Sequence, residues 1–261
     1  MISIITPTYN RSYTLTRLYN SLVDQTDNDF EWIIVDDGST DDTARLISNI
    51  LKNSIIPTYY YYQNNQGKPS AINTGVSYAT REYILIVDSD DILTKDAIKS
   101  IKESIVNIKS LKTTFSGVCF RKANFNGKLL GEKITSHQIY SYLTATEGGH
   151  LFKGDLAYCF KKNHLITNKF PYFTNEKFVP ELYVWNKITD EGKVYFHNTK
   201  VIYLCEYLPD GLSINFKTQL KNNPNGFLLF YKDQFNRENS LLEKIKKAIR
   251  IIQCYYYRII K

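Results

Sequence analysis

The stretch YILIVDSDDIL, Tyr83–Leu93, decides the fold of this chain. It begins as an unbroken apolar run and ends abruptly in Asp88, Ser89, Asp90 and Asp91. A continuous apolar run of this length is typical of a strand that is covered on both faces of a sheet. Three carboxylates at the tip of one strand repel each other, so a physical reason for their position is needed.

Three similar runs precede this stretch, and their starts are separated by roughly 25 to 30 residues, which is the size of a strand–helix–strand unit. They are ISII from Ile2, WIIV from Trp32 and TYYYY from Thr58. Helical patterns lie between the runs, and a clear stripe of isoleucines predicts a helix over 95–109. We therefore predict an α/β fold with a Rossmann-like, doubly wound, mostly parallel sheet and helices on both faces.

The helices between these runs have recognisable apolar stripes. The first is marked by Leu15, Leu18 and Leu22. In the second, Ser39 or Thr40 is the expected N-cap, and the buried stripe is formed by Ala44, Ile47 and Ile50 or Leu51. The third begins near Pro69, with apolar contacts from Ala71, Ile72 and Tyr78, and the fourth has Ile98, Ile101, Ile105 and Ile108.

The second half of the chain is less regular. The segment SGVCFRKANFNGKLLG from Ser116 predicts two strands joined at Asn126-Gly127, and PELYVWNKI predicts a helix that starts near Pro180. We expect one large domain over 1–220, with halves 1–115 and 116–220. A helical, basic amphipathic tail is expected over 221–261.

Composition narrows the class of protein. The chain has 261 residues, 43% hydrophobic and 23% charged, which suits an ordinary globular protein. Of the net charge of +7, five units lie in residues 243–261. A nucleic-acid binder would carry its charge across a folded face, so no nucleic-acid partner is expected. The four cysteines form no C-x-x-C pair, which argues against a zinc or redox motif. The start MISIITPTY has no basic signal region, and a cytoplasmic location is expected.

The C-terminal segment from Leu241 is amphipathic. Its apolar side contains Leu241 or Leu242, Ile245, Ala248 or Ile249, Ile252, Tyr255 or Tyr256 and Ile259. A basic amphipathic helix suits peripheral contact with the cytoplasmic face of an anionic inner membrane. The alternative is a helix that packs on the domain or on a second subunit.

Polar residues gather at the predicted carboxyl ends of the strands, where open α/β sheets bind ligands. Asp88 and Asp90 flank one residue, and at a chain reversal both could approach a divalent cation such as Mg²⁺ or Mn²⁺. The alternative is an acidic loop that caps the next helix, as Asp91 could do. Asp36 or Asp37 could accept a hydrogen bond from a base or ribose, or the DDGSTDD run could only cap a helix. Lys68 follows Gly67 at a helix start, which suits a phosphate, although an ordinary solvated lysine is the commoner case for that residue taken alone.

Four motifs in this order and at these spacings closely resemble the nucleotide-sugar-binding half of family 2 glycosyltransferases of the GT-A fold. They are SIITPTYNR, WIIVDDGSTDDT, NQGKPSAINTG and YILIVDSDDIL. The resemblance is dense over Ile2–Leu93. It continues weakly through NEKFVPELYVWNKI and through CEYLPDGLS from Cys205.

The resemblance implies a role for each matching residue. Asp88-Ser89-Asp90 would be the D-x-D motif, with Asp90 the main ligand of Mn²⁺ or Mg²⁺ and Asp88 a second ligand nearer the ribose or sugar. Asp36 or Asp37 would bind uracil or ribose. The remaining donor contacts would be Pro7, Thr8, Tyr9 and Asn10 in the nucleoside pocket, with Arg11 nearby, and Gly67, Lys68 and Asn73 against the nucleotide sugar.

The sequence departs from the family pattern at the catalytic base, because family members often have a Glu-Asp pair where this chain has Glu181 followed by Leu182. Glu181 is the candidate base and Glu176 the fallback. The alternative is that Glu181 caps its own helix near Pro180.

The resemblance implies an inverting, metal-dependent hexosyl- or N-acetylhexosaminyltransferase. Its donor would be a nucleotide sugar, UDP-linked by family frequency, and its acceptor a saccharide or lipid-linked saccharide of a bacterial surface polysaccharide. One rival is a non-catalytic sugar-nucleotide-binding or scaffold protein of the same fold, which the missing Glu-Asp pair leaves open. A nucleotidyltransferase is disfavoured because the first loop, TPTYNR, contains no glycine.

Overall fold

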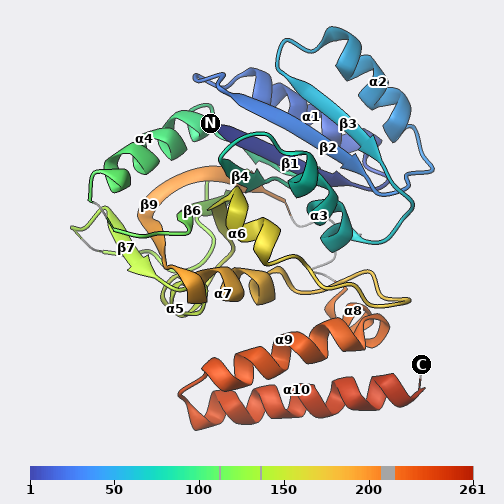
Figure 1. Ribbon diagram of the computed structural model, residues 1–261, viewed down its shortest axis with the longest axis vertical. Helices are drawn as coiled ribbons and strands as arrows, with labels where there is room; N and C mark the ends of the chain where they lie inside the picture. Colours follow the sequence, from blue (N-terminus) through green and yellow to red (C-terminus); the bar gives the residue numbers. More distant parts are fainter. Residues whose placement is uncertain (112, 136, 207–214, 261) are drawn as a thin grey trace.

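Nine strands form one mixed sheet in the part of the chain that the computed structural model describes, which is 1–111, 113–135, 137–206 and 215–260 (Figure 1). The strand order is β3-β2-β1-β4-β8-β6-β9-β5, and β7 pairs with β9 outside this path. The predicted CEYLPDGLS motif lies mostly outside the described residues.

The first half is the parallel sheet expected from the sequence. Its strands are β1 (Ile2–Thr8), β2 (Phe30–Asp36), β3 (Thr58–Tyr62) and β4 (Tyr83–Ile86), and all three neighbouring pairs are parallel. The helices α1 (Ser12–Val23), α2 (Thr43–Asn53) and α3 (Lys68–Tyr78) alternate with them. This arrangement confirms the strand–helix rhythm and brings the carboxyl ends of β1, β2 and β4 to one edge.

The second half pairs its strands in both directions. Its strands are β5 (Ile92–Leu93), β6 (Gly117–Asn124), β7 (Tyr140–Leu143), β8 (Leu156–Lys161) and β9 (Val194–Cys205). β8 is antiparallel to both β4 and β6, and β9 is parallel to β6 but antiparallel to β5 and β7. The parallel character is therefore confined to the first half and to the β6–β9 pair. The turn at Asn126-Gly127 is present, but the second predicted strand is reduced to one bridge between Ala123 and Leu129.

Helices cover both faces of the sheet. One apolar cluster joins the sheet to α1, α2 and α4 (Ala97–Lys109). The other joins it to α3, α5 (Ala145–Phe152), α6 (Lys162–Thr167) and α7 (Glu181–Glu191). The predicted stripes of α1 and α4 are fully buried, which confirms them.

The start of α2 was predicted wrongly. The helix begins at Thr43 without a side-chain cap, and its buried residues are Thr43, Ile47 and Ile50. Ala44 and Leu51 are exposed. The hydroxyl of Ser39 instead accepts a hydrogen bond from the backbone N–H of Asn10, so it ties the loop after β2 to the loop after β1.

Three helices form a separate layer beside α7 (Figure 1). They are α8 (Phe216–Asn222), α9 (Pro224–Arg237) and α10 (Leu241–Ile260), and they share an apolar cluster of Leu220, Phe227, Leu228, Tyr231 and Cys254. The domain boundary expected at residue 220 lies within α8. Leu220 itself packs against α9, with the helical layer. The guanidinium of Arg237 ties this layer to Asp190 of α7 at 2.5 Å. Among the described helices, none has both the length and the apolarity needed to cross a membrane.

Candidate functional site

The acidic segment after β4 is a chain reversal. The backbone N–H of Val87 still donates to Ile5 as in a strand, and the N–H of Asp91 then donates back to the carbonyl of Asp88 at 3.1 Å. The chain resumes as β5 at Ile92. The reversal leaves Asp88 and Asp90 at the edge of a cavity of about 160 Å³, which the parallel strand ends surround. The cavity is lined by Pro7, Thr8, Tyr9, Arg11, Asp37, Lys68, Asp88, Ser89 and Asp90.

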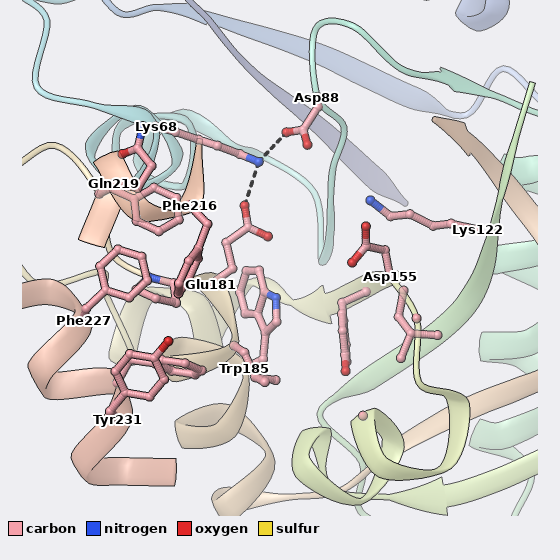
Figure 2. A pocket seen from close by; sticks show the side chains of 18 residues that line it. Lys68, Asp88, Lys122, Asp155, Glu181, Trp185, Phe216, Gln219, Phe227 and Tyr231 are labelled. Atoms are coloured by element: carbon pink, nitrogen blue, oxygen red, sulfur yellow. Dashed lines mark ion pairs between the residues drawn. The ribbon is translucent and has the colours of Figure 1, made fainter. Parts of the chain in front are cut away.

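Lys68 is the first residue of α3 and links two carboxylates (Figure 2). Its Nζ atom lies 2.6 Å from Oδ1 of Asp88 and 2.8 Å from Oε1 of Glu181. The preceding residue, Gly67, has a φ of +91°, and a Cβ built there would lie 1.9 Å from the carbonyl oxygen of Lys177. Glycine is therefore required at 67 by the backbone, and this close approach positions Lys68.

The charges around the reversal are unevenly balanced. Burial lowers the pKa of Lys68, but Asp88 and Glu181 outweigh burial, and the pKa is raised. Burial raises the pKa of Asp88, but Lys68 and Lys122 outweigh it, and the pKa lies below its ordinary value. Burial and then repulsion from Asp88 raise the pKa of Asp90. The negative charge of Asp90 is therefore less well compensated than that of Asp88.

These residues fit a divalent cation shared with a diphosphate. Within the described residues, no three His, Cys, Asp or Glu side chains gather into a metal site made by protein alone. Asp88 and Asp90 nevertheless line the cavity together, and the buried hydroxyl of Thr8 beside them has no hydrogen-bond partner in the described part of the chain. One or two carboxylates plus substrate phosphate oxygens is a common way to hold Mg²⁺.

Asp91 does not cap the following helix, so that expectation is wrong. Its side chain is buried and accepts a hydrogen bond from the backbone N–H of Glu206 at 3.2 Å. Burial, followed by repulsion from Asp88, raises the pKa of Asp91 to about 7. Asp91 thus fastens the reversal to the end of β9.

Asp36 and Asp37 have different surroundings in the structure, a difference that the sequence does not show. Asp36 is fully buried and accepts hydrogen bonds from the Ser39 N–H and the Tyr60 hydroxyl, and it does not line the cavity. Asp37 lines the cavity, and its carboxylate accepts hydrogen bonds from the Gln63 side chain and from the backbone N–H groups of residues 66 and 67. Asp37 therefore also holds the loop that carries Lys68.

Two predicted donor contacts are engaged elsewhere. Asn10 adopts a left-handed φ of 52°, and its side-chain oxygen accepts a hydrogen bond from the backbone N–H of Thr40 at 2.8 Å. Asn73 exchanges hydrogen bonds with both backbone groups of Phe170 at 2.9 and 3.0 Å. It lines a different cavity, of about 200 Å³, and neither asparagine lines the cavity beside Asp90. Both amides hold one loop against another.

The two candidate bases have different surroundings. Glu181 begins α7, and its carboxylate reaches Lys68. Glu176 is buried and accepts hydrogen bonds from the Asn225 N–H, the Asn225 side chain and the Gly226 N–H at 2.6 to 3.0 Å. These groups lie at the first turn of α9, so Glu176 caps that helix. Only Glu181 lies beside the acidic reversal.

A larger cavity of about 540 Å³ meets the first one at Lys68 and Asp88 (Figure 2). Glu181, Lys122, Asp155 and Trp185 line it from the sheet side and α7. The helical layer supplies Phe216, Gln219, Phe227, Phe230 and Tyr231. This wall is absent from the residues predicted from the sequence, although the aromatic residues that recur between 216 and 231 were a signal for it.

Known proteins resemble this chain in sequence. A model of the family described as "Glycosyl transferase family 2" matches residues 3–165. A protein of Campylobacter jejuni named "GalNAc(5)-diNAcBac-PP-undecaprenol beta-1,3-glucosyltransferase" is 29% identical over 77% of this chain and 64% of its own length. The chain spans only 21% and 20% of two uncharacterized glycosyltransferases from Rickettsia species, each 35% identical over the matched part.

Solved structures share the fold. Residues 1–349 of S. aureus TarS in complex with UDP-GlcNAc superpose with a TM-score of 0.70 at 19% identity, over 98% of this chain and 72% of that one. The mannosyltransferase PcManGT from Pyrobaculum calidifontis, with GDP-Man and Mn²⁺, gives 0.61 at 15% identity over 98% and 73%. The mixed sheet and its flanking helices are thus a GT-A fold.

Proposed function

The chain belongs to glycosyl transferase family 2, and from that premise we propose that it moves a sugar from a nucleoside diphosphate donor to an acceptor hydroxyl with inversion. The meeting of the two cavities supports this. The smaller one has the acidic reversal and suits the donor's diphosphate, and the larger one has Glu181 and an aromatic wall. The anomeric carbon would lie where the cavities meet, at Lys68 and Asp88.

Each polar residue then has a task in the transfer. Glu181 accepts the proton of the acceptor hydroxyl while the hydroxyl oxygen attacks the anomeric carbon and the nucleoside diphosphate leaves. General-base catalysis of this kind contributes about 10²–10⁴-fold to the rate. Lys68 orients the carboxylate of Glu181 through their ion pair and presents its ammonium group toward the leaving diphosphate. Asp90 and Asp88 would hold Mn²⁺ or Mg²⁺, which neutralises charge on the leaving group when it is bound.

The remaining motif residues hold this geometry. Asp37 orients the loop before Lys68 and faces the nucleoside from the cavity wall. Pro7, Thr8 and Tyr9 form the opposite wall at the end of β1, with Arg11 beside them. Gly67 allows the loop to approach residue 177 closely. Asn10 and Asn73 act indirectly, because each fixes a loop next to the donor cavity.

The donor is proposed to be a UDP-sugar, with a hexosyl or N-acetylhexosaminyl group transferred. The TarS complex with UDP-GlcNAc supports UDP, whereas the mannosyltransferase with GDP-Man shows that this fold also accepts GDP. The acceptor is proposed to be a saccharide linked to a lipid, as the name of the Campylobacter relative describes for that protein. The reaction would then take place at the cytoplasmic face of a membrane, in the synthesis of a bacterial surface polysaccharide.

Calorimetric titration tests the donor site directly. UDP and GDP are titrated into the wild type with and without Mn²⁺, and then into Asp90→Ala. The matched control is Asp42→Ala, because Asp42 is an exposed aspartate just before α2 that pairs with its neighbour Arg45. We expect Mn²⁺-dependent binding that is lost in Asp90→Ala and kept in the control. Equal binding by both variants would contradict the metal role of Asp90. Donor binding without transfer to any saccharide would favour the non-catalytic rival.

A further inference from the structure

The last helix, α10, packs with the face opposite to its apolar stripe. Cys254 is fully buried against α9, and Ile251 and Tyr257 lie partly buried beside it. Ile245 precedes Cys254 by nine residues, which is two and a half helical turns, so the two side chains point in opposite directions. Ile245, Ile252 and Ile259 are 49%, 67% and 84% exposed. They repeat every seven residues and therefore form one line along the helix.

This exposed line belongs to a continuous apolar face along the 20 residues of α10. The other large apolar residues on that face are also exposed: Leu241, Leu242, Ile249, Tyr256 and Ile260. A surface helix ordinarily turns its apolar stripe toward the core and its charged residues toward water. In α10 the apolar stripe instead faces the solvent. An apolar face of this length on a globular protein marks an interaction surface.

Figure 1 shows α10 at the outer edge of the molecule, with α9 between it and α7. The exposed apolar residues extend from Leu241 to Ile260, so this face is accessible along the whole helix. It also lies on the side away from the sheet, so docking there leaves both cavities open.

The charges beside the apolar face favour an anionic bilayer as its partner. Lys244 and Lys246 lie on opposite sides of the stripe near the start of α10, and Arg258 lies near its end. Lys232 of α9 adds a cation next to the Tyr255 ring, 5.3 Å from its centroid. The acidic residues of α10 are limited to Glu243, which pairs with Lys246 at 2.6 Å. An apolar stripe flanked by cations matches acyl chains below anionic headgroups.

A second copy of this chain fits less well. If two α10 helices met through their apolar faces, the same flanking cations would face each other, with one acidic residue per helix to offset them. Like charges in such positions are unfavourable. The bilayer has the opposite charge and the flat shape that a straight outer helix requires.

We propose that α10 docks on an anionic phospholipid surface through Leu241, Ile245, Ile249, Ile252, Tyr256 and Ile259. The docking proposal depends only on the exposed apolar face of α10 and the charges beside it. Its consequence rests on the proposed transferase function: α9 supplies Phe227, Phe230 and Tyr231 to the larger cavity, so that cavity lies about two helix layers, or ~20 Å, above the bilayer. A saccharide whose lipid stays in the membrane could reach Glu181 from there.

Vesicle co-sedimentation tests the docking, using the full chain without donor or acceptor. Vesicles of phosphatidylcholine with about 30% phosphatidylglycerol are compared with vesicles of phosphatidylcholine alone. The test variant is Ile245→Gln, Ile252→Gln and Ile259→Gln together. The matched control is Ile55→Gln, Val106→Gln and Ile139→Gln, three residues that are exposed to a similar extent elsewhere on the molecule. We expect the test variant to lose about tenfold or more of the partition coefficient and the control to lose little.

A second variant tests the electrostatic part and leaves the apolar face intact. Lys244→Gln, Lys246→Gln and Arg258→Gln together should weaken binding to the anionic vesicles and reduce its dependence on salt. Circular dichroism establishes that each variant keeps its helices.

Three results would overturn the proposal. They are no binding of the wild type to anionic vesicles, equal loss in the test and control variants, and a wild-type dimer in analytical ultracentrifugation that the isoleucine variant converts to monomer. The last would assign the face to a second copy. None of these results bears on UDP binding or transfer, so a failure here is distinguishable from a failure of the proposed function.

Discussion

The ammonium nitrogen of Lys68 lies 2.8 Å from the carboxylate of Glu181 and, on its other side, 2.6 Å from that of Asp88. One cation thus joins the start of α3, the start of α7 and the tip of β4. This places the candidate base beside the acidic reversal, although Asp88 and Glu181 are far apart in the sequence. The first two predictions depend on this arrangement.

Glu181→Gln should lower the transfer rate by about 10²–10⁴-fold, because glutamine cannot accept the proton of the acceptor hydroxyl. UDP affinity should stay close to that of the wild type, since Glu181 lines the larger cavity and not the donor cavity. Turnover and calorimetric titration measure the two effects. Glu191→Gln, at the other end of the same helix, serves as the control and should retain activity. A fully active Glu181→Gln enzyme would remove Glu181 from the mechanism.

Lys68→Met should weaken UDP binding by about tenfold or more, because the cation next to the diphosphate is lost. It should also slow transfer, because Glu181 loses the partner that orients it. A double-mutant cycle with Glu181→Gln separates the two effects. If Lys68 positions Glu181, the losses in kcat are less than additive, with a coupling of about 0.5–3 kcal/mol. Strictly additive losses would mean that Lys68 acts on the donor alone.

Glu176→Gln should destabilise the protein and leave the chemistry intact. Glu176 accepts hydrogen bonds from the first turn of α9, and weakening bonds to a buried carboxylate costs about 1–3 kcal/mol. Denaturant unfolding should show this loss, while kcat at low temperature stays near the wild-type value. A fall in kcat comparable to that of Glu181→Gln, in a folded protein, would restore Glu176 as the base.

Phe216→Ala should raise the KM for the acceptor and leave UDP affinity unchanged. The half-buried ring of Phe216 lines the larger cavity and contacts Phe227 edge-on, with centroids 5.7 Å apart. Apolar and aromatic walls supply much of the affinity of such cavities. Phe235→Ala on α9 is the control, since Phe235 does not line the cavity. A change in UDP affinity without a change in acceptor KM would place the donor, not the acceptor, against this wall.

Glu31→Gln should change how stability depends on pH. Burial raises the pKa of Glu31, but hydrogen bonds from Ser3 and Thr80 outweigh burial, and the pKa lies below its ordinary value. The ionised carboxylate therefore stabilises the fold above pH ~4.5, and this contribution is lost as the pH falls through the lowered pKa. We expect Glu31→Gln to be about 1–2 kcal/mol less stable at pH 7, with a difference that shrinks in acid. Glu103→Gln, on an exposed face of α4, should show no such trend.

Local patterns predicted the first half well because its elements follow from short-range chemistry. The leucine stripe of α1 and the isoleucine stripe of α4 are buried as their spacing indicates. Asn73 shows where this reasoning stops. Its position in the NQGKPSAINTG motif suggests contact with the nucleotide sugar, but its amide both donates to and accepts from the backbone of Phe170, 97 residues away. A local sequence pattern does not determine which distant backbone group a side chain will bind.

The sequence by itself determined the parallel sheet, the acidic reversal and the motifs that resemble family 2 glycosyltransferases, because strand and helix periodicity and strand-end chemistry are local properties. Only the tertiary structure decided that Asp37 rather than Asp36 faces the cavity, that Glu176 caps α9, and that Lys68 joins Glu181 to Asp88. It also decided which face of α10 is left exposed. These outcomes depend on long-range packing, in which each polar group takes the partner that the fold brings within reach.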